Sequence, residues 1–147
     1  MFLGRYEHTI DSKGRVAVPA KFRHGLSDGM VITRWVDKCL TLYPSAYFEA
    51  LAQKVSSLPV TDPNARNLRR IFFSDASNCD IDKQGRIVIA SDLRNYADMG
   101  SDEALIIFAG VNDYIEIWNK ENWLAVKQKA EENSDSIVSA LNVFGIL

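Results

Sequence analysis

The sequence predicts an α+β protein in which two copies of one β-hairpin and helix unit share a single core. Thirteen residues that begin at Asp11 recur from Asp82, displaced by 71 positions (82 − 11), in a chain of 147 residues. Alternating apolar runs flank turn residues in both copies, and a helical apolar pattern closes each copy. A chain of this length buries about 70% of the surface that its unfolded form exposes, which favours two fused halves over two separate domains.

The first copy is predicted from its periodicity and its turn residues. Asp11 can accept hydrogen bonds from backbone amides two residues on, and Gly14 suits the positive φ of a tight turn, so a β-hairpin is expected around them. Ser45 is the expected N-cap of a longer helix. The expected strands are Leu3–Ile10, Arg15–Val18, Met30–Arg34 and Cys39–Tyr43, and the expected helices are Pro19–His24 and Ser45–Leu58.

The second copy repeats this order with an expected insertion of 4 residues (75 − 71) around Met99–Glu103. Its later strands are expected at Ala104–Ala109 and Tyr114–Trp118, and its helix begins near Asn119. The expected division is residues 1–60 for the first repeat, 61–73 for a connecting helix and 74–147 for the second repeat. The second repeat ends in an apolar tail, Ser136–Leu147, which needs a surface to pack on.

Charge is distributed unevenly along the chain, whose net charge is −2. Residues 1–94 carry 14 Lys+Arg against 10 Asp+Glu, whereas residues 95–147 carry 3 against 9. The acidic balance argues against indiscriminate phosphate binding but permits a local basic patch in the first part. Apolar stretches are much shorter than the roughly 20 residues of a membrane span, so a cytoplasmic protein without membrane contact is expected.

The two turns give the most specific functional signal. In each copy an arginine, Arg15 or Arg86, faces outward where the neighbouring valine or isoleucine faces inward. A two-stranded β-element fits the roughly 12 Å width of the DNA major groove, and arginine can donate two hydrogen bonds to guanine. The alternative is that each arginine only pairs with Asp11 or Asp82 and stiffens its turn. Because packing alone does not require the same outward arginine twice, duplication favours a DNA-binding role.

Further cations surround the turns and fit contacts to phosphate, although each could also be an ordinary solvated side chain. The second site is less basic, because Asp92 replaces Lys21 and Ala76 replaces Arg5. The expected DNA-binding residues are Arg15, Arg86, Lys13, Lys83, Arg5, Lys21, Arg23 and Arg94. The residues expected to shape the turns are Asp11, Gly14, Asp82 and Gly85.

Other chemistry-bearing residues have simpler explanations. His8 aligns with Cys79 on an inward strand face, and both are interpreted as core residues; Cys39 is a second structural thiol. Carboxylates at Asp75, Asp80 and Asp82 could hold magnesium, but Thr9 replaces Asp80 in the first copy, which favours a solvated edge. No catalytic residue, metal, cofactor or small-molecule substrate is expected. Arginines at positions 66, 69 and 70 fit either a nucleic acid or a contact between subunits.

The repeated Asp-x-x-x-Arg, the opening Met-Phe-Leu-Gly-Arg-Tyr-Glu-His and Leu68-Arg-Arg-Ile-Phe-Phe73 together resemble the MraZ family of the AbrB/SpoVT-like superfamily. This resemblance covers nearly the whole chain. It implies interleaved β-hairpins in a barrel-like core and DNA binding through the turns, with Asp11, Arg15, Asp82 and Arg86 at the two motifs. It also implies a nucleoid-associated transcriptional regulator that assembles into rings on tandem short promoter sites of the bacterial division and cell-wall gene cluster.

Three alternatives remain open at this point. An AbrB-type antitoxin would sequester a partner toxin, to which the apolar tail could bind, and would regulate its own operon. An adaptor without DNA function would have no need of the turn arginines. A metal- or nucleotide-dependent enzyme is the least favoured, because the sequence has no phosphate-cradling glycine loop, histidine cluster or nucleophile elbow.

Overall fold

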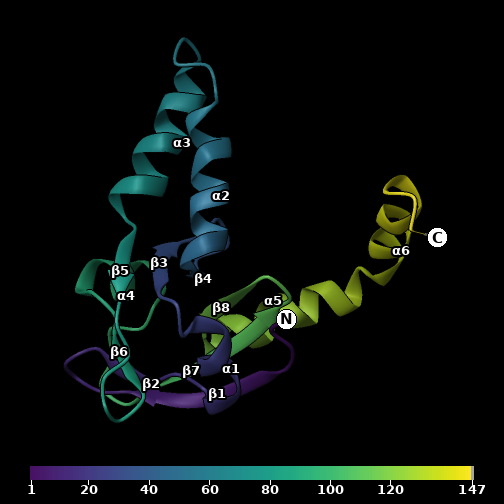
Figure 1. Cartoon of the computed structure of the whole chain (residues 1–147). Coiled ribbons are helices and arrows are strands. Elements are labelled where there is room, and N and C mark those ends of the chain that lie inside the picture. Colours follow the sequence, from purple (N-terminus) through teal and green to yellow (C-terminus); the bar gives the residue numbers. More distant parts are fainter. Residues whose placement is uncertain (147) are drawn as a thin grey trace.

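A six-stranded antiparallel sheet lies at the centre of the molecule, in the order β1-β7-β8-β4-β3-β5 (Figure 1). The computed structural model describes residues 1–146. The first copy supplies β1 (Arg5–Ile10), β2 (Arg15–Ala17), α1 (Ala20–Arg23), the 3₁₀ turn η1 (His24–Leu26), β3 (Met30–Arg34), β4 (Leu40–Pro44) and α2 (Ser45–Ser56). After α3 (Pro63–Ser74), the second supplies β5 (Ser77–Cys79), β6 (Arg86–Val88), α4 (Ser91–Tyr96), β7 (Ala104–Val111), β8 (Tyr114–Asn119), α5 (Lys120–Glu132) and α6 (Ser134–Val143).

The two copies exchange strands. In the sheet, β1 of the first copy pairs with β7 of the second, and β5 of the second pairs with β3 of the first. The strand order is therefore symmetric about the contact between β8 and β4. Because each copy completes the other's half of the sheet, neither half can form this sheet alone. The α+β class and the interleaving of the repeats are confirmed, although the six-stranded sheet stays open and does not close into a barrel.

The larger of two hydrophobic clusters in the described residues joins the large sheet to a two-stranded ribbon of β2 and β6. Alternate residues of the large sheet point into this core, as period-two strands require. The ribbon closes it from the other side with residues that are at most 1% exposed. The central core residues are Ile32, Leu40, Leu42, Ile106, Phe108, Ile115 and Ile117 from the large sheet and Val16, Val18, Ile87 and Ile89 from the ribbon and the residues that follow it.

Helices cover the outer face of the large sheet. The half of the sheet formed by β4, β3 and β5, with its helices, is the first lobe, and the half formed by β1, β7 and β8 is the second lobe. α2 and α3 form an antiparallel hairpin that rises from the first lobe, whereas α5 leads into α6, which extends away from the body (Figure 1). Phe48 of α2 stacks on Phe72 of α3 with ring centroids 5.3 Å apart. In the second lobe, Trp123 of α5 packs edge-on against Trp118 with ring centroids 6.0 Å apart. Phe48 and Trp123 hold equivalent positions in the two copies, 75 residues apart (123 − 48).

Three local expectations were wrong. The tight turn after β1 does not close a ladder between β1 and β2, because β2 pairs with β6 of the other copy. Ser45 is the first residue of α2, and its N-cap is Pro44, which provides no side-chain cap. Pairings of Met30 with Pro44 and of Ile106 with Asn119 place β7 at an offset of 76 (106 − 30), so the insertion before β7 has 5 residues (76 − 71).

The tail is partly described by the structure. Most of it lies in α6, where Ile137, Val138 and Val143 are exposed and Leu141 is half-buried. Leu147, the last residue of the predicted tail, lies outside the described residues. Among residues 1–146, no helix has the length and apolar character that a bilayer crossing requires.

Candidate nucleic-acid interface

The ribbon of β2 and β6 presents both turn arginines on one face. In its antiparallel register Arg15 lies opposite Val88, and Arg86 lies opposite Ala17. Directly paired residues share a face, so all four side chains point outward while Val16 and Ile87 are buried. The two arginines are diagonal neighbours, a relation that places such residues about 7–8 Å apart. The fold therefore brings together two residues that are 71 positions apart in the chain (86 − 15).

Each arginine follows a turn that is built in the same way. Gly14 has φ +80° and Gly85 has φ +78°, and each donates its N–H to the carbonyl of the aspartate three residues earlier at 3.0 Å. The Asp11 carboxylate accepts from the N–H groups of Lys13 and Arg15, both at 2.9 Å. Asp82 accepts from Gln84 at 2.8 Å and from Arg86 at 2.9 Å. An aspartate and a positive-φ glycine thus fix the backbone before each arginine.

An ion pair orients each guanidinium. Arg15 Nε lies 2.6 Å from Asp11 Oδ2, and Arg86 Nε lies 3.0 Å from Asp82 Oδ2. The stiffening contact considered above is therefore present in both copies. It uses Nε only, and within residues 1–146 the Nη groups have no hydrogen-bond partner. These are the groups that donate to guanine or phosphate in bidentate contacts.

Hydrogen bonds lower the pKa of both turn aspartates. The backbone N–H of Arg15, followed by its guanidinium, lowers the pKa of Asp11 below 3.8. The backbone N–H groups of Arg86 and Gln84, and then the Arg86 guanidinium, do the same for the pKa of Asp82. A hydrogen bond to the charged form of a carboxylate favours that form. Each turn then holds one negative and two positive side chains when its lysine, Lys13 or Lys83, is counted.

Two further arginines brace the turns across the repeat. Arg23 Nε donates to Val18 O at 2.9 Å, and its guanidinium occupies the space that a side chain at Gly85 would need. Arg94 Nε donates in the same way to Ile89 O at 3.0 Å and lies against Gly14. Each arginine therefore packs on the turn of the other copy, a role that the sequence pattern did not indicate. DNA contact by these two arginines stays a prediction.

The remaining predicted cations differ in placement. Lys13, Lys83 and Lys21 are exposed, the first two in the turns and the third on α1. Arg5 lies at the start of β1, whose far end leads into the first turn. Six residues of strand span roughly 20 Å, so the fold does not bring Arg5 to the turns. Val88, which is 61% exposed on the ribbon face, was not predicted as a site residue, although its outward register was the available signal.

Residues with other possible chemistry lie apart from the ribbon face. Asp75 forms an ion pair with Arg34 at 2.9 Å, and no group of His, Cys, Asp and Glu within residues 1–146 could hold a metal ion. Burial raises the pKa of the Cys39 thiol, and it raises the pKa of Cys79 to about 11. Burial, followed by the charge of Arg23, lowers the pKa of His8. Both thiols are therefore protonated at neutral pH and suit a structural role.

The exchanged strands and the paired arginine turns define a class of protein in which two copies of one β-hairpin and helix unit interleave. A family model described as "MraZ protein, putative antitoxin-like" matches the chain twice, over residues 1–71 and 72–143. The chain belongs to the MraZ family.

Proteins named "Transcriptional regulator MraZ" from several bacteria are similar to this chain over nearly its whole length. The protein of Herpetosiphon aurantiacus is 46% identical over 146 residues, which cover 99% of this chain and 100% of that protein. The protein of Natranaerobius thermophilus is 44% identical with the same coverage. The protein of Roseiflexus castenholzii is 47% identical over 141 residues, which cover 96% of each chain.

Proposed function

We propose that the protein is a transcriptional regulator that binds double-stranded DNA sequence-specifically through the outward face of the β2–β6 ribbon. The observation that carries this proposal is the placement of Arg15 and Arg86 on one face, each held by an aspartate through Nε. Two oriented guanidinium groups on a narrow ribbon match the shape and hydrogen-bond acceptors of a major groove. The names of the relatives support regulation as the purpose of this binding.

The proposed target is the promoter of the bacterial division and cell-wall gene cluster, as the family resemblance implies. Few cations face outward from one ribbon, so a single chain should bind weakly at physiological salt. We therefore propose that several copies assemble into a ring and bind tandem short sites. Linked contacts of this kind raise avidity by about 10²–10⁴.

The test is equilibrium binding to a duplex from the region upstream of the protein's own gene and to a scrambled duplex of equal composition. Arg15→Ala should weaken binding to the upstream duplex by about 1–3 kcal/mol and affect the scrambled duplex much less. Lys54→Ala on α2 removes one exposed positive charge away from the turns and serves as the control. Equal losses on both duplexes for Arg15→Ala would show that direct readout is wrong.

An antitoxin function is the second candidate, because the matching family model is described as antitoxin-like and α6 exposes apolar side chains. Such a protein would bind a small toxin and repress its own operon. Affinity purification of the tagged protein from its own cells separates the two functions. A stoichiometric small partner that releases the protein from DNA would favour the antitoxin, whereas recovery with its own copies and DNA alone would favour the regulator.

A further inference from the structure

The C-terminal helix α6 carries an apolar stripe that the described chain covers only in part. Ile137, Ala140, Leu141 and Phe144 recur at the spacing i, i+3, i+4 and i+7, which aligns them along one side of a helix. Ile137 is 48% exposed and Phe144 is 75% exposed. Figure 1 shows why: α6 projects from the end of α5 and lies away from both sheets. Exposed apolar surface of this kind marks an interaction site.

In the first lobe, the helix that corresponds to α6 is α3, and α3 is packed against its neighbour. There α3 follows α2 after a connection of six residues, 57–62, folds back, and buries Phe72 to 4% exposure. In the second copy α6 follows α5 as α3 follows α2 in the first. Only Asn133 separates α5 from α6. Connections between packed helices have about 2–8 residues, so the single residue Asn133 does not allow α6 to fold back on α5 as α3 folds back on α2.

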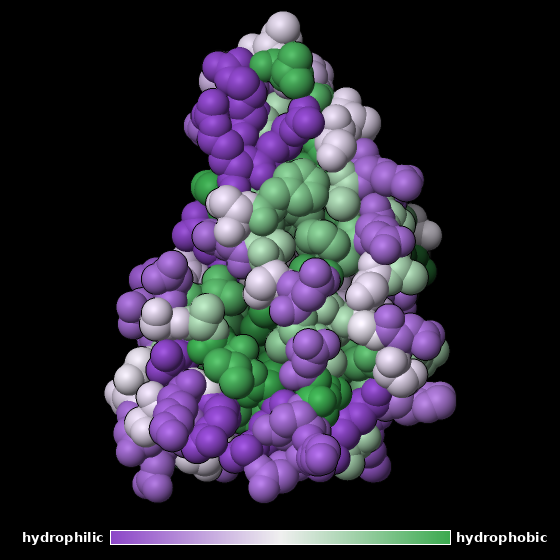
Figure 2. All heavy atoms as spheres, turned by 60° about the vertical axis from the view of Figure 1, so that its left-hand side comes forward, coloured by the Kyte–Doolittle hydropathy of each residue, from purple (hydrophilic) through white to green (hydrophobic). Residues whose placement is uncertain are grey.

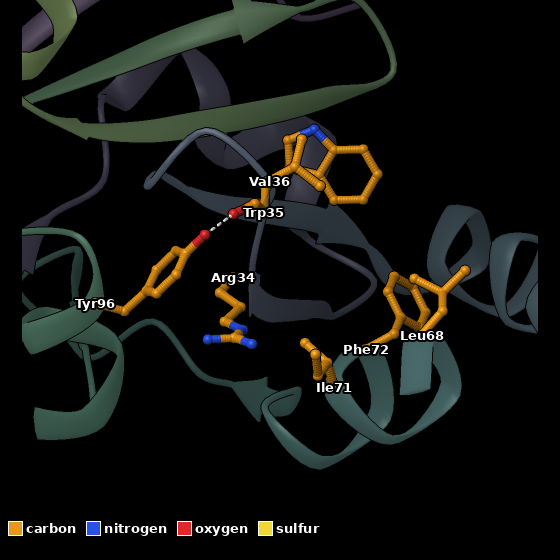
Figure 3. A pocket seen from close by; sticks show the side chains of 7 residues that line it. All are labelled: Arg34, Trp35, Val36, Leu68, Ile71, Phe72 and Tyr96. Carbon is orange, nitrogen blue, oxygen red and sulfur yellow. Dashed lines mark hydrogen bonds between the residues drawn. The ribbon is translucent and has the colours of Figure 1, made fainter. Parts of the chain in front are cut away.

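An apolar groove on the first lobe offers a place for such a stripe. It is a hollow of about 180 Å³ between α3, α4 and the turn after β3 (Figure 3). Apolar cavities of about 150 Å³ hold a benzene ring, so this hollow suits one aromatic side chain. Figure 2 shows a band of apolar surface on the side of the molecule toward α3 and α4. The lining residues are Arg34, Trp35, Val36, Leu68, Ile71, Phe72 and Tyr96.

The one charged residue of this lining is already neutralised. Arg34 pairs with Asp75 at 2.9 Å, and its guanidinium lies 4.7 Å from the centre of the Tyr96 ring. The Tyr96 hydroxyl donates to the carbonyl of Trp35. An incoming apolar side chain therefore displaces no unpaired charge. By contrast, each of two hollows of the second lobe is lined by a charged side chain that has no ion-pair partner within residues 1–146, Glu121 in one and Arg5 in the other, and an apolar stripe would have to desolvate it.

Charge also favours the groove of the first lobe as the partner of α6. The groove wall α3 carries Arg66, Arg69 and Arg70 and no acidic residue. The end of α5 carries Glu131 and Glu132, and the first turn of α6 carries Asp135. Within residues 1–146 none of these six side chains forms an ion pair. Opposite charges on two surfaces favour their encounter and fix its orientation.

We propose that α6 of one copy docks in the groove of a second copy, with Phe144 in the hollow between Ile71 and Tyr96. The proposal rests on the self-association included in the proposed function and names the surfaces that make it. The tail and the groove are two different surfaces of the chain, so the contact between two copies is heterologous, that is, head-to-tail. Such a contact leaves one free tail and one free groove at the ends of every open assembly, and it forms a ring when its rotation closes.

The test mixes two variants that each lack one side of the contact. Phe144→Glu disables the tail, and Ile71→Glu disables the groove; both residues are exposed, and circular dichroism and thermal melting verify that both variants fold. Multi-angle light scattering should give the mass of a single chain for either variant alone. The equimolar mixture should contain a species of two chains, because one intact tail meets one intact groove. Val60→Glu, at an exposed apolar position outside the groove, should keep the wild-type mass.

Other outcomes overturn the proposal. A folded variant that keeps the wild-type mass would show that its side chain is not in the contact. A mixture that stays at the mass of one chain would show that α6 docks elsewhere, including on the hollows of the second lobe or on a different protein. Binding of the same variants to a short single-site duplex gives an independent readout. Loss of mass with retained DNA binding supports the docking, whereas wild-type assembly without DNA binding would reject the proposed function alone.

Discussion

Arg15 and Arg86 are each held through one nitrogen, and this restraint is the central feature at the scale of the residue. A free arginine loses rotamer entropy when it binds a base, and the ion pairs to Asp11 and Asp82 reduce that loss beforehand. The outward register of both arginines could be predicted from alternation alone. The bracing by Arg23 and Arg94 could not, because each contacts a turn about 60 to 80 positions away in the chain and local patterns carry no such information.

Lys13 should act on DNA differently from Arg15. It is exposed in the turn, and its flexible ammonium group suits a phosphate contact. Lys13→Ala should weaken binding to upstream and scrambled duplexes alike and reduce the slope of log K against log salt by about 1. A salt titration of both duplexes measures this. A loss confined to the upstream duplex would instead assign Lys13 to base recognition.

The turn aspartates should make stability depend on pH in the acidic range. Their folded pKa values lie below 3.8, so the stability they contribute is present above 3.8 and is lost as pH falls through the folded value. The double variant Asp11→Asn, Asp82→Asn should have a lower free energy of unfolding than wild type at neutral pH. This difference in free energy should shrink as pH falls below 3.8. Urea denaturation across pH measures it, with Asp28→Asn as an exposed control outside the turns. A difference independent of pH would contradict the assignment.

At the scale of the element, the turns and the ribbon form one unit built from both repeats. The N–H of Val18 donates to Gly85 O at 2.9 Å, and the N–H of Ile89 donates to Gly14 O at 2.8 Å. The positions of most strands and helices could be predicted from periodicity and turn residues. The pairing of β2 with β6 could not be predicted. A short strand after a tight turn is expected to pair with the strand just before it in the chain, which here is β1.

Gly85→Ala tests this unit. The residue has φ +78°, and an added Cβ would meet the Arg23 guanidinium, so the free energy of unfolding should fall by about 1–3 kcal/mol. Combining it with Arg23→Ala should recover the part of the loss that comes from crowding. Gly100→Ala, where the nearest atom would be 3.5 Å away, is the control and should change stability by less than about 0.5 kcal/mol. Equal effects at both glycines in urea denaturation would contradict the bracing.

At the scale of the whole molecule, internal duplication gives one chain a symmetric sheet and an asymmetric exterior. The symmetric part presents paired arginines, and the asymmetric part offers an apolar groove on one lobe and an unpaired helix on the other. The duplication could be predicted from the repeat of Asp11–Arg23. The direction of α6 could not, since an apolar tail predicts only that some surface covers it.

The most direct test of the account is to map the amide groups that respond to DNA. The Phe144→Glu variant, which should be a single chain, would be titrated with the upstream duplex and followed by NMR. The largest chemical-shift changes should fall on the turns and on the ribbon face, residues 11–17 and 82–88, with smaller changes on α2 and α3. Changes concentrated on the arginines of α3, with both turns unaffected, would contradict it.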